Sequence, residues 1–177
     1  GLGVFLMILL SKNEKKFILL LARTGYYCNS YRKHFSIYDS SIDRLLKSKF
    51  VEKKGPIIIF GKMMNIYILT SKDLVRNHFL IRPYSGKSDQ LEHDYVLGKV
   101  YLMISETEKD TWITETDLGI MHPNESVIDG LYVNNNGEKV GVEILTESYN
   151  DNMIEERNNF IKKYCNKKIV IHTKALR

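Results

Sequence analysis

The segment that most constrains the fold is VIDGLYVNNNGEKVGVEILTES, residues 127–148. Two apolar runs flank the sequence Asn-Asn-Asn-Gly, and Asn and Gly tolerate the positive φ angles that tight turns require. The segment therefore predicts an antiparallel hairpin with strands over 126–133 and 140–145. Asp129 on the first strand and Glu143 on the second then lie on neighbouring strands, so that two carboxylates meet at one edge of a sheet.

Charge is divided unequally along the 177 residues. Residues 1–87 contain 16 Lys and Arg against 5 Asp and Glu, whereas residues 88–177 contain 10 against 16. The resulting charges of +11 and −6 predict two units with different partners. A basic unit suits a polyanion because each neutralised phosphate releases condensed counterions, and an acidic unit suits cations.

Other features of the chain exclude several classes of protein. Cys28 and Cys165 are far apart and lack metal-ligand spacing, so we expect reduced thiols and a cytoplasmic protein. The apolar run over 4–10 is too short to span a bilayer and lacks the flanks of a secretory signal, so no membrane partner is expected. The sequence contains no phosphate-cradling glycine loop and no zinc motif.

The sequence pattern of the N-terminal half predicts short helices and a two-stranded ribbon. Ser11 and Glu14 have the spacing of a capping box, ahead of a helix that ends at Gly25. The later elements are a helix over 29–34, a helix capped by Ser36 or Asp39 and running to about Lys49, strands over 50–54 and 65–69, and a helix that starts near Thr70 or Ser71.

This order resembles a winged helix-turn-helix domain over residues 11–82, within a first domain of residues 1–82. The phrases IDRLLKSKFVEKKG and IYILTSKDL match the recognition helix, wing and closing helix of that family. The third helix of such a domain enters the major groove of DNA. With Ile42, Leu45 and Leu46 turned inward, the resemblance implies that double-stranded DNA is contacted by outward residues, namely Arg32, Lys33, Ser40, Ser41, Arg44, Lys47 and Lys62.

The expected wing is apolar where solvent exposure is usual. Residues 57–60 and Met63-Met64 form this apolar stretch. We expect it to pack on the second unit or on another copy of the chain in a homodimer. Insertion into the minor groove of DNA is the alternative.

The C-terminal half, residues 92–177, follows a linker over 83–91. It predicts a helix over 91–105, a strand over 112–115, the hairpin, a helix over 151–164 and a strand over 169–173. This order resembles the core of the PD-(D/E)XK nuclease superfamily, a small restriction-endonuclease-like α/β domain with a mixed central sheet. The resemblance implies that Asp129 and Glu143 are catalytic and bind Mg²⁺, with Glu92 or Asp94 joining the metal or orienting the attacking water.

The ordered set LEHDYVLGKV, WITE, IDG, VEILTES and YCNKKIVIHT also resembles the replication-relaxation family of plasmid and mobile-element proteins. This resemblance covers nearly the whole chain. It implies a DNA-binding protein of a plasmid, phage or integrated element that acts in replication, relaxation or transfer, together with proteins of the replication or transfer complex.

The chain departs from the nuclease motif at Leu145, where that superfamily has a lysine that steadies the attacking water. Lys162 or Lys163 on the following helix is the expected substitute, because Lys139 lies near the turn and remote from Glu143. The departure keeps a second class open, a non-enzymatic winged-helix transcription regulator whose C-terminal half dimerises or senses a ligand. A protein–protein adaptor that binds no DNA is the third alternative. His93 is interpreted as a packed or hydrogen-bonded histidine.

Overall fold

The computed structural model describes residues 9–86 and 90–177 and has a mixed α+β fold. Most of the apolar run over 4–10, and part of the linker over 83–91, lie outside the described residues. No helix within the described ranges is long and apolar enough to cross a membrane. The described part contains seven α-helices: α2 (Lys12–Thr24), α3 (Asp39–Lys47), α4 (Lys72–Phe79), α5 (Leu91–Met103), α6 (Glu106–Lys109), α7 (Glu115–Met121) and α8 (Asp151–Tyr164).

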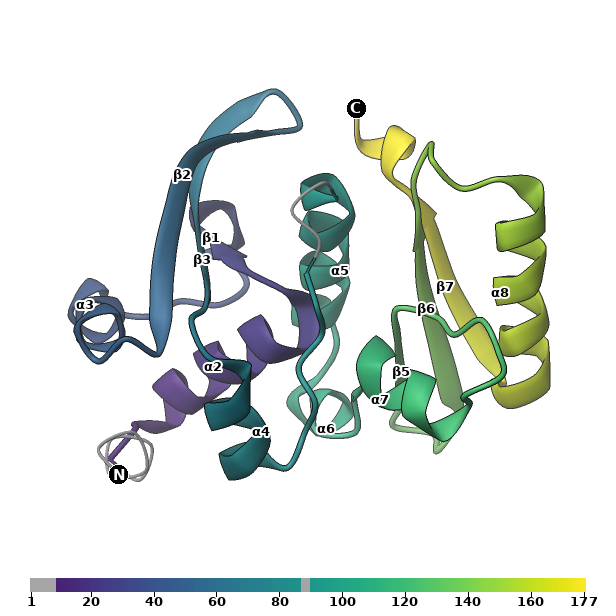
Figure 1. The fold of residues 1–177 in the computed structure, drawn as a ribbon, viewed down its shortest axis with the longest axis horizontal. Helices are drawn as coiled ribbons and strands as arrows, with labels where there is room; N and C mark the ends of the chain where they lie inside the picture. The colour runs from purple at the N-terminus through teal and green to yellow at the C-terminus, as the bar shows by residue number, and fades with distance from the viewer. Residues whose placement is uncertain (1–8, 87–89) are drawn as a thin grey trace.

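The strands form two sheets, ordered β1-β3-β2 and β4-β5-β6-β7. All neighbours are antiparallel except β6 and β7, so the second sheet is mixed, as predicted. Figure 1 shows α5 between the two sheets and α8 on the other side of the second sheet. The strands are β1 (Tyr27–Cys28), β2 (Val51–Ile59), β3 (Lys62–Leu69), β4 (Ile113–Thr114), β5 (Gly130–Val133), β6 (Lys139–Leu145) and β7 (Lys167–His172), and two short 3₁₀ helices are η1 (Asn29–Tyr31) and η2 (Thr173–Leu176).

Local sequence signals account for the first and third predicted helices. The N–H of Glu14 donates to Ser11 Oγ at 3.1 Å, and the N–H of Ser11 donates to Glu14 Oε1 at 3.0 Å, which completes the predicted capping box of α2. Helix α2 ends at Gly25, whose φ of 112° suits a residue without a Cβ. In α3, Ile42 and Leu45 are buried, as predicted.

The second helix predicted over 29–34 is wrong. Only the single 3₁₀ turn η1 forms there. The preceding residues form β1 and pair with β3, with Tyr27 opposite Tyr67, so the chain enters residues 29–34 in an extended conformation. Helices α6 and α7 were not predicted, although Ser105 and Thr114 cap them through side-chain hydrogen bonds.

One hydrophobic core extends from the N-terminal half into the C-terminal half. Gly98 of α5 lets the Tyr31 ring approach closely, and Tyr31 Oη donates to the carbonyl oxygen of Tyr95 at 2.8 Å. Arg23 Nη1 donates to Tyr101 Oη at 2.9 Å across the same boundary. The predicted linker therefore joins two segments that share a core. A smaller cluster includes β5 and α8 residues: Leu118, Ile128, Leu131, Phe160 and Ile161.

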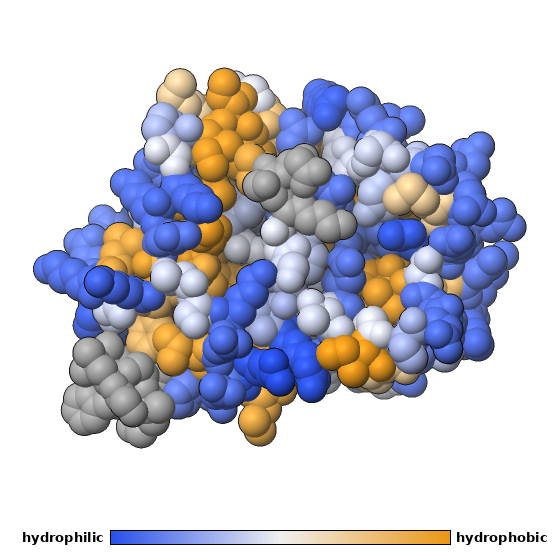
Figure 2. Space-filling model, in the orientation of Figure 1, coloured by the Kyte–Doolittle hydropathy of each residue, from blue (hydrophilic) through white to orange (hydrophobic). Residues whose placement is uncertain are grey.

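The apolar hairpin β2–β3 is partly covered by the C-terminal half. Ile59 is fully buried, and the Phe60 ring packs edge-on against Tyr95 of α5, with ring centroids 5.7 Å apart. This contact agrees with one of the two packing arrangements expected for the wing. Ile58 and Met63 remain 68% and 71% exposed, and Figure 2 shows apolar surface over this hairpin.

Candidate metal centre

Three acidic residues lie side by side at one end of strands β4 and β5. The registers of β4 with β5 and of β5 with β6 place Glu115, Asp129 and Glu143 in one row across the sheet. Asp129 is held against β6, because its Oδ2 accepts from the N–H of Ile144 at 2.7 Å and its own N–H donates to the carbonyl of Val142 at 3.1 Å. The structure thus brings together the two carboxylates that the hairpin pattern placed on neighbouring strands.

His93 reaches this row from α5. Its Nε2 lies 3.0 Å from Asp129 Oδ1, and its Nδ1 lies 3.0 Å from Asp94 Oδ1. Tyr84 Oη donates to the same Asp94 oxygen at 2.6 Å. Asp94 therefore fixes the orientation of the imidazole, as carboxylates do for metal-binding histidines. The interpretation of His93 as a hydrogen-bonded residue accounts for Nδ1 but leaves Nε2 directed at the two carboxylates of the sheet.

The resulting cluster has the composition and spacing of a cation site. One ligand atom from each of His93, Asp129 and Glu143 lies within 4.8 Å of the others, and all three residues are buried. Five buried side-chain polar atoms in the described part of the chain do not meet the geometry of a hydrogen bond, and three of them are His93 Nε2, which lies 3.0 Å from Asp129 Oδ1, and the two Glu143 carboxylate oxygens, of which Oε2 lies 3.4 Å from Arg157 Nε. Unsatisfied buried polar atoms are costly. A divalent cation would satisfy all three, so the residues fit such an ion.

The pKa shifts within the cluster are also consistent with a cation site. Burial and the charge of Asp129 raise the pKa of Glu143 to about 11, although Arg157 opposes this shift. Burial by itself lowers the pKa of His93, but hydrogen bonds and charge from Asp129 and Asp94 raise it to about 10. Both shifts favour a proton on Glu143 and a proton on His93 when no cation is bound. One divalent cation would carry the same charge as these two protons, which it would displace.

Arg157 of α8 is a further member of the site that the sequence analysis missed. Its Nε lies 3.4 Å from Glu143 Oε2, and its guanidinium lies 5.2 Å from the centre of the Tyr149 ring. Arg157 follows Met153 by four residues and precedes Phe160 by three. Helical periodicity alone therefore places it on the inner face of α8, and this was the available signal.

Glu92, expected beside the metal, lies elsewhere. Its Oε2 accepts from Arg177 Nη2 at 2.8 Å, and Arg177 Nη1 binds Glu147 at 3.0 Å. Successive side chains of a helix point about 100° apart, so the neighbour of a residue that faces Asp129 directly can be turned well away from it. His93 faces Asp129, and Glu92 faces the surface.

The lysines expected to compensate for Leu145 lie away from the cluster. Lys162 and Lys163 are exposed on α8, and Lys163 Nζ pairs with Glu125 Oε1 at 3.3 Å. Lys139 is exposed at the turn end of β6. The arginine of α8 supplies the positive charge beside the β6 carboxylate instead.

The residues expected to contact DNA lie largely at the surface. The Arg44 guanidinium binds the buried Glu14 carboxylate, with Nε 3.0 Å from Oε2. This residue therefore anchors α3 to α2, and the structure does not leave it free to read a base as expected. Arg32 pairs with Asp39 at 3.2 Å. Ser41 is half-buried, and the exposed residues are Arg32, Lys33, Ser40, Arg44, Lys47 and Lys62.

The chain matches no protein-family model, no curated protein and no solved structure. The functional argument therefore depends on the geometry of the site and on the surface charge.

Proposed function

We propose that this protein binds duplex DNA through its basic N-terminal half and hydrolyses phosphodiester bonds at a divalent cation held by its C-terminal half. The convergence of His93, Asp129 and Glu143 on one buried point carries the proposal. The order of elements supports it, because a helix, a hairpin bearing two acids, a helix and a parallel strand resemble the PD-(D/E)XK core. Such a protein would act in the replication, relaxation or transfer of a plasmid, phage or integrated element.

The donor set indicates which cation to test. Mg²⁺ prefers oxygen ligands in octahedral geometry, whereas Mn²⁺ shares the preference for carboxylates and accepts an imidazole nitrogen more readily than Mg²⁺ does. We therefore propose Mn²⁺ ahead of the Mg²⁺ that the sequence resemblance implied. When bound, such an ion polarises a phosphoryl oxygen and lowers the pKa of a coordinated water.

The chain's own residues would orient the site and stabilise charge. Asp94 and Tyr84 fix the His93 ring through hydrogen bonds of 3.0 and 2.6 Å. Arg157, beside Glu143, lies where a positive charge would stabilise negative charge on a transferring phosphoryl group, the task of the lysine that Leu145 replaces.

The test combines thermal unfolding with cleavage of plasmid DNA, each measured with and without Mn²⁺. Saturating Mn²⁺ at about 100 times its Kd should stabilise the wild-type protein by about 2.7 kcal/mol. Asp129→Asn and Glu143→Gln should lose both this stabilisation and the cleavage. Glu155→Gln is the matched control, because Glu155 is an exposed acid on α8. Equal stabilisation by Mn²⁺ in all four proteins would refute the metal centre.

A non-enzymatic DNA-binding regulator is the second candidate, and Leu145 at the expected lysine position favours it. In that case Mn²⁺ stabilises the protein without any cleavage, and a gel shift still shows salt-dependent binding to duplex DNA. Absence of that binding would remove the DNA-binding part of both candidates.

A further inference from the structure

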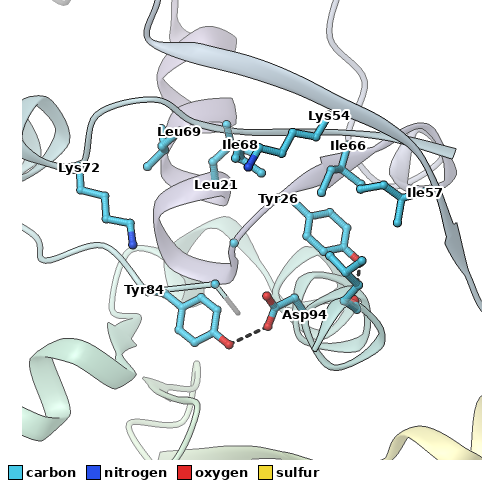
Figure 3. A pocket seen from close by; sticks show the side chains of 13 residues that line it. Leu21, Tyr26, Lys54, Ile57, Ile66, Ile68, Leu69, Lys72, Tyr84 and Asp94 are labelled. Atoms are coloured by element: carbon cyan, nitrogen blue, oxygen red, sulfur yellow. Dashed lines mark hydrogen bonds between the residues drawn. The ribbon is translucent and has the colours of Figure 1, made fainter. Parts of the chain in front are cut away.

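A cavity of about 230 Å³ lies between α2, the β2–β3 hairpin and the start of α5 (Figure 3). Its apolar wall includes Leu21, Ile66 and Ile68. Two of its lining residues, Tyr84 and Asp94, also orient His93 of the candidate metal centre, and none of the residues expected to contact DNA lines it. At about 30 Å³ per water molecule, the space corresponds to roughly seven or eight waters, which is enough for a small planar group.

The floor of this cavity presents an uncommitted acceptor. Asp94 Oδ1 accepts from Tyr84 Oη and lies beside His93 Nδ1, whereas Asp94 Oδ2 makes no hydrogen bond with the described residues. Oδ2 is bordered by two glycines, since a Cβ added to Gly25 or Gly86 would lie 3.1 or 3.2 Å from it. Backbone without side chains therefore leaves this oxygen open toward the cavity.

The rim and sides favour an anion joined to a flat ring. Lys54 from β2 and Lys72 from α4 line the cavity (Figure 3), where Lys54 Nζ lies 3.9 Å from Glu52 Oε1 and Lys72 Nζ donates to Ser85 Oγ at 3.2 Å. Tyr26 lines the cavity with its ring fixed, because its Oη donates to the carbonyl of Leu91 at 2.6 Å and Tyr31 stacks on it with ring centroids 6.4 Å apart. An immobilised aromatic ring can stack on a nucleobase, and lysine ammonium groups bind phosphate.

We propose that this cavity binds one nucleotide, with an N–H edge of its base donating to Asp94 Oδ2 and its phosphate between Lys54 and Lys72. The nucleotide is either a free mononucleotide or an unpaired residue of a DNA strand, because both present the same chemistry. Asp94 also orients His93, so the occupied pocket adjoins the candidate metal centre. Binding itself requires no cation.

The test is calorimetric titration of the full chain with deoxyguanosine 5′-monophosphate, without added metal. Guanine is the probe because it presents two adjacent N–H donors. Deoxyguanosine lacks the phosphate, and deoxyribose 5-phosphate lacks the base. Each should bind at least about tenfold more weakly than the nucleotide, which is the size of one charge-assisted contact. Lys72→Ala should weaken binding of the nucleotide by about tenfold and leave deoxyguanosine binding unchanged. The control Lys168→Ala removes an exposed lysine of β7 outside this cavity and should change neither.

Asp94→Asn provides an isosteric second variant. Its carbonyl oxygen can still accept from Tyr84, but the cavity-facing atom becomes a donor, so guanine binding should weaken while the circular dichroism stays native. Two thymine-rich single strands test whether the bound nucleotide belongs to a DNA strand. One strand has a central guanine, and the other has an abasic residue at the same position. Preference for the guanine strand indicates a strand-borne nucleotide, and binding of the mononucleotide alone indicates a free one.

Two results would overturn the proposal. One is that the mononucleotide does not bind and the guanine strand binds no better than the abasic strand. The other is that deoxyribose 5-phosphate binds as tightly as the nucleotide, which would leave an anion site without base recognition. Neither result depends on Mn²⁺ or on cleavage, so failure of this proposal is distinct from failure of the metal centre.

Discussion

Replacing Gly98 with alanine tests whether the two halves of the chain are held together by one core. A Cβ at this position would lie 2.4 Å from Tyr31 Oη and 2.8 Å from Tyr31 Cζ. Tyr31 is fully buried, and its ring cannot withdraw without loss of the 2.8 Å hydrogen bond to Tyr95. Overpacking costs about 1–3 kcal/mol, and the lost hydrogen bond adds about 1 kcal/mol. The better helix propensity of alanine offsets about 1 kcal/mol of this cost, so the variant should be about 1–3 kcal/mol less stable than the wild-type protein.

Gly119→Ala is the matched control, because this glycine is also helical but has no heavy atom within 4 Å of an added Cβ. It should stabilise the protein by about 0.5–1 kcal/mol. Urea unfolding is followed by circular dichroism and by the fluorescence of Trp112, which is buried in the C-terminal half. For Gly98→Ala, both signals should shift together to lower urea. A Gly98→Ala variant as stable as Gly119→Ala would refute the packing argument, and two separate transitions would contradict the shared core.

Three further predictions concern the surface, the ion pair of α2 with α3, and the thiols. Burial tends to raise the pKa of Glu14, but hydrogen bonds, chiefly from Arg44, outweigh it and lower the pKa. The stability from this pair is therefore present above the ordinary carboxyl pKa and is lost as pH falls through the lowered one. Arg44→Met should cost about 1 kcal/mol at pH 7, allowing for the half-exposed guanidinium, and urea melts of variant and wild type should converge in acid. Lys47→Ala should reduce the slope of log K against log salt for duplex DNA by about 1, and an unchanged slope would exclude a phosphate contact. Iodoacetamide should modify half-buried Cys165 before Cys28, which is fully buried and whose thiol pKa is raised by burial. Mass spectrometry measures the order of modification, and modification of Cys28 first would contradict the prediction.

Short-range patterns in the sequence determined much of the local structure. The capping box fixed the start of α2, because Ser11 and Glu14 satisfy each other's backbone groups within one turn. The hairpin also followed from local chemistry. Its turn sets the register, and strand alternation sets the face, so the proximity of Asp129 and Glu143 is encoded within fewer than twenty residues.

Local patterns failed where a partner from another segment competes for the backbone. Residues 29–34 were predicted to form a helix, but Tyr27 and Cys28 pair with β3, and only one 3₁₀ turn follows them. Likewise, the charge of Arg44 and its position on α3 predicted a DNA contact, yet the buried carboxylate of Glu14 binds it. In both cases a contact distant in sequence outweighed a local preference.

The sequence by itself determined the two carboxylates of the hairpin, and tertiary structure decided what faces them. Glu92 and His93 are consecutive, and only the rotation of α5 about its axis selects which one reaches Asp129. That rotation is set by close packing of Gly98 against Tyr31, more than sixty residues earlier. The composition of the candidate centre therefore depends on a packing contact between distant segments, because side-chain direction on a buried helix is fixed by the shape of its neighbours.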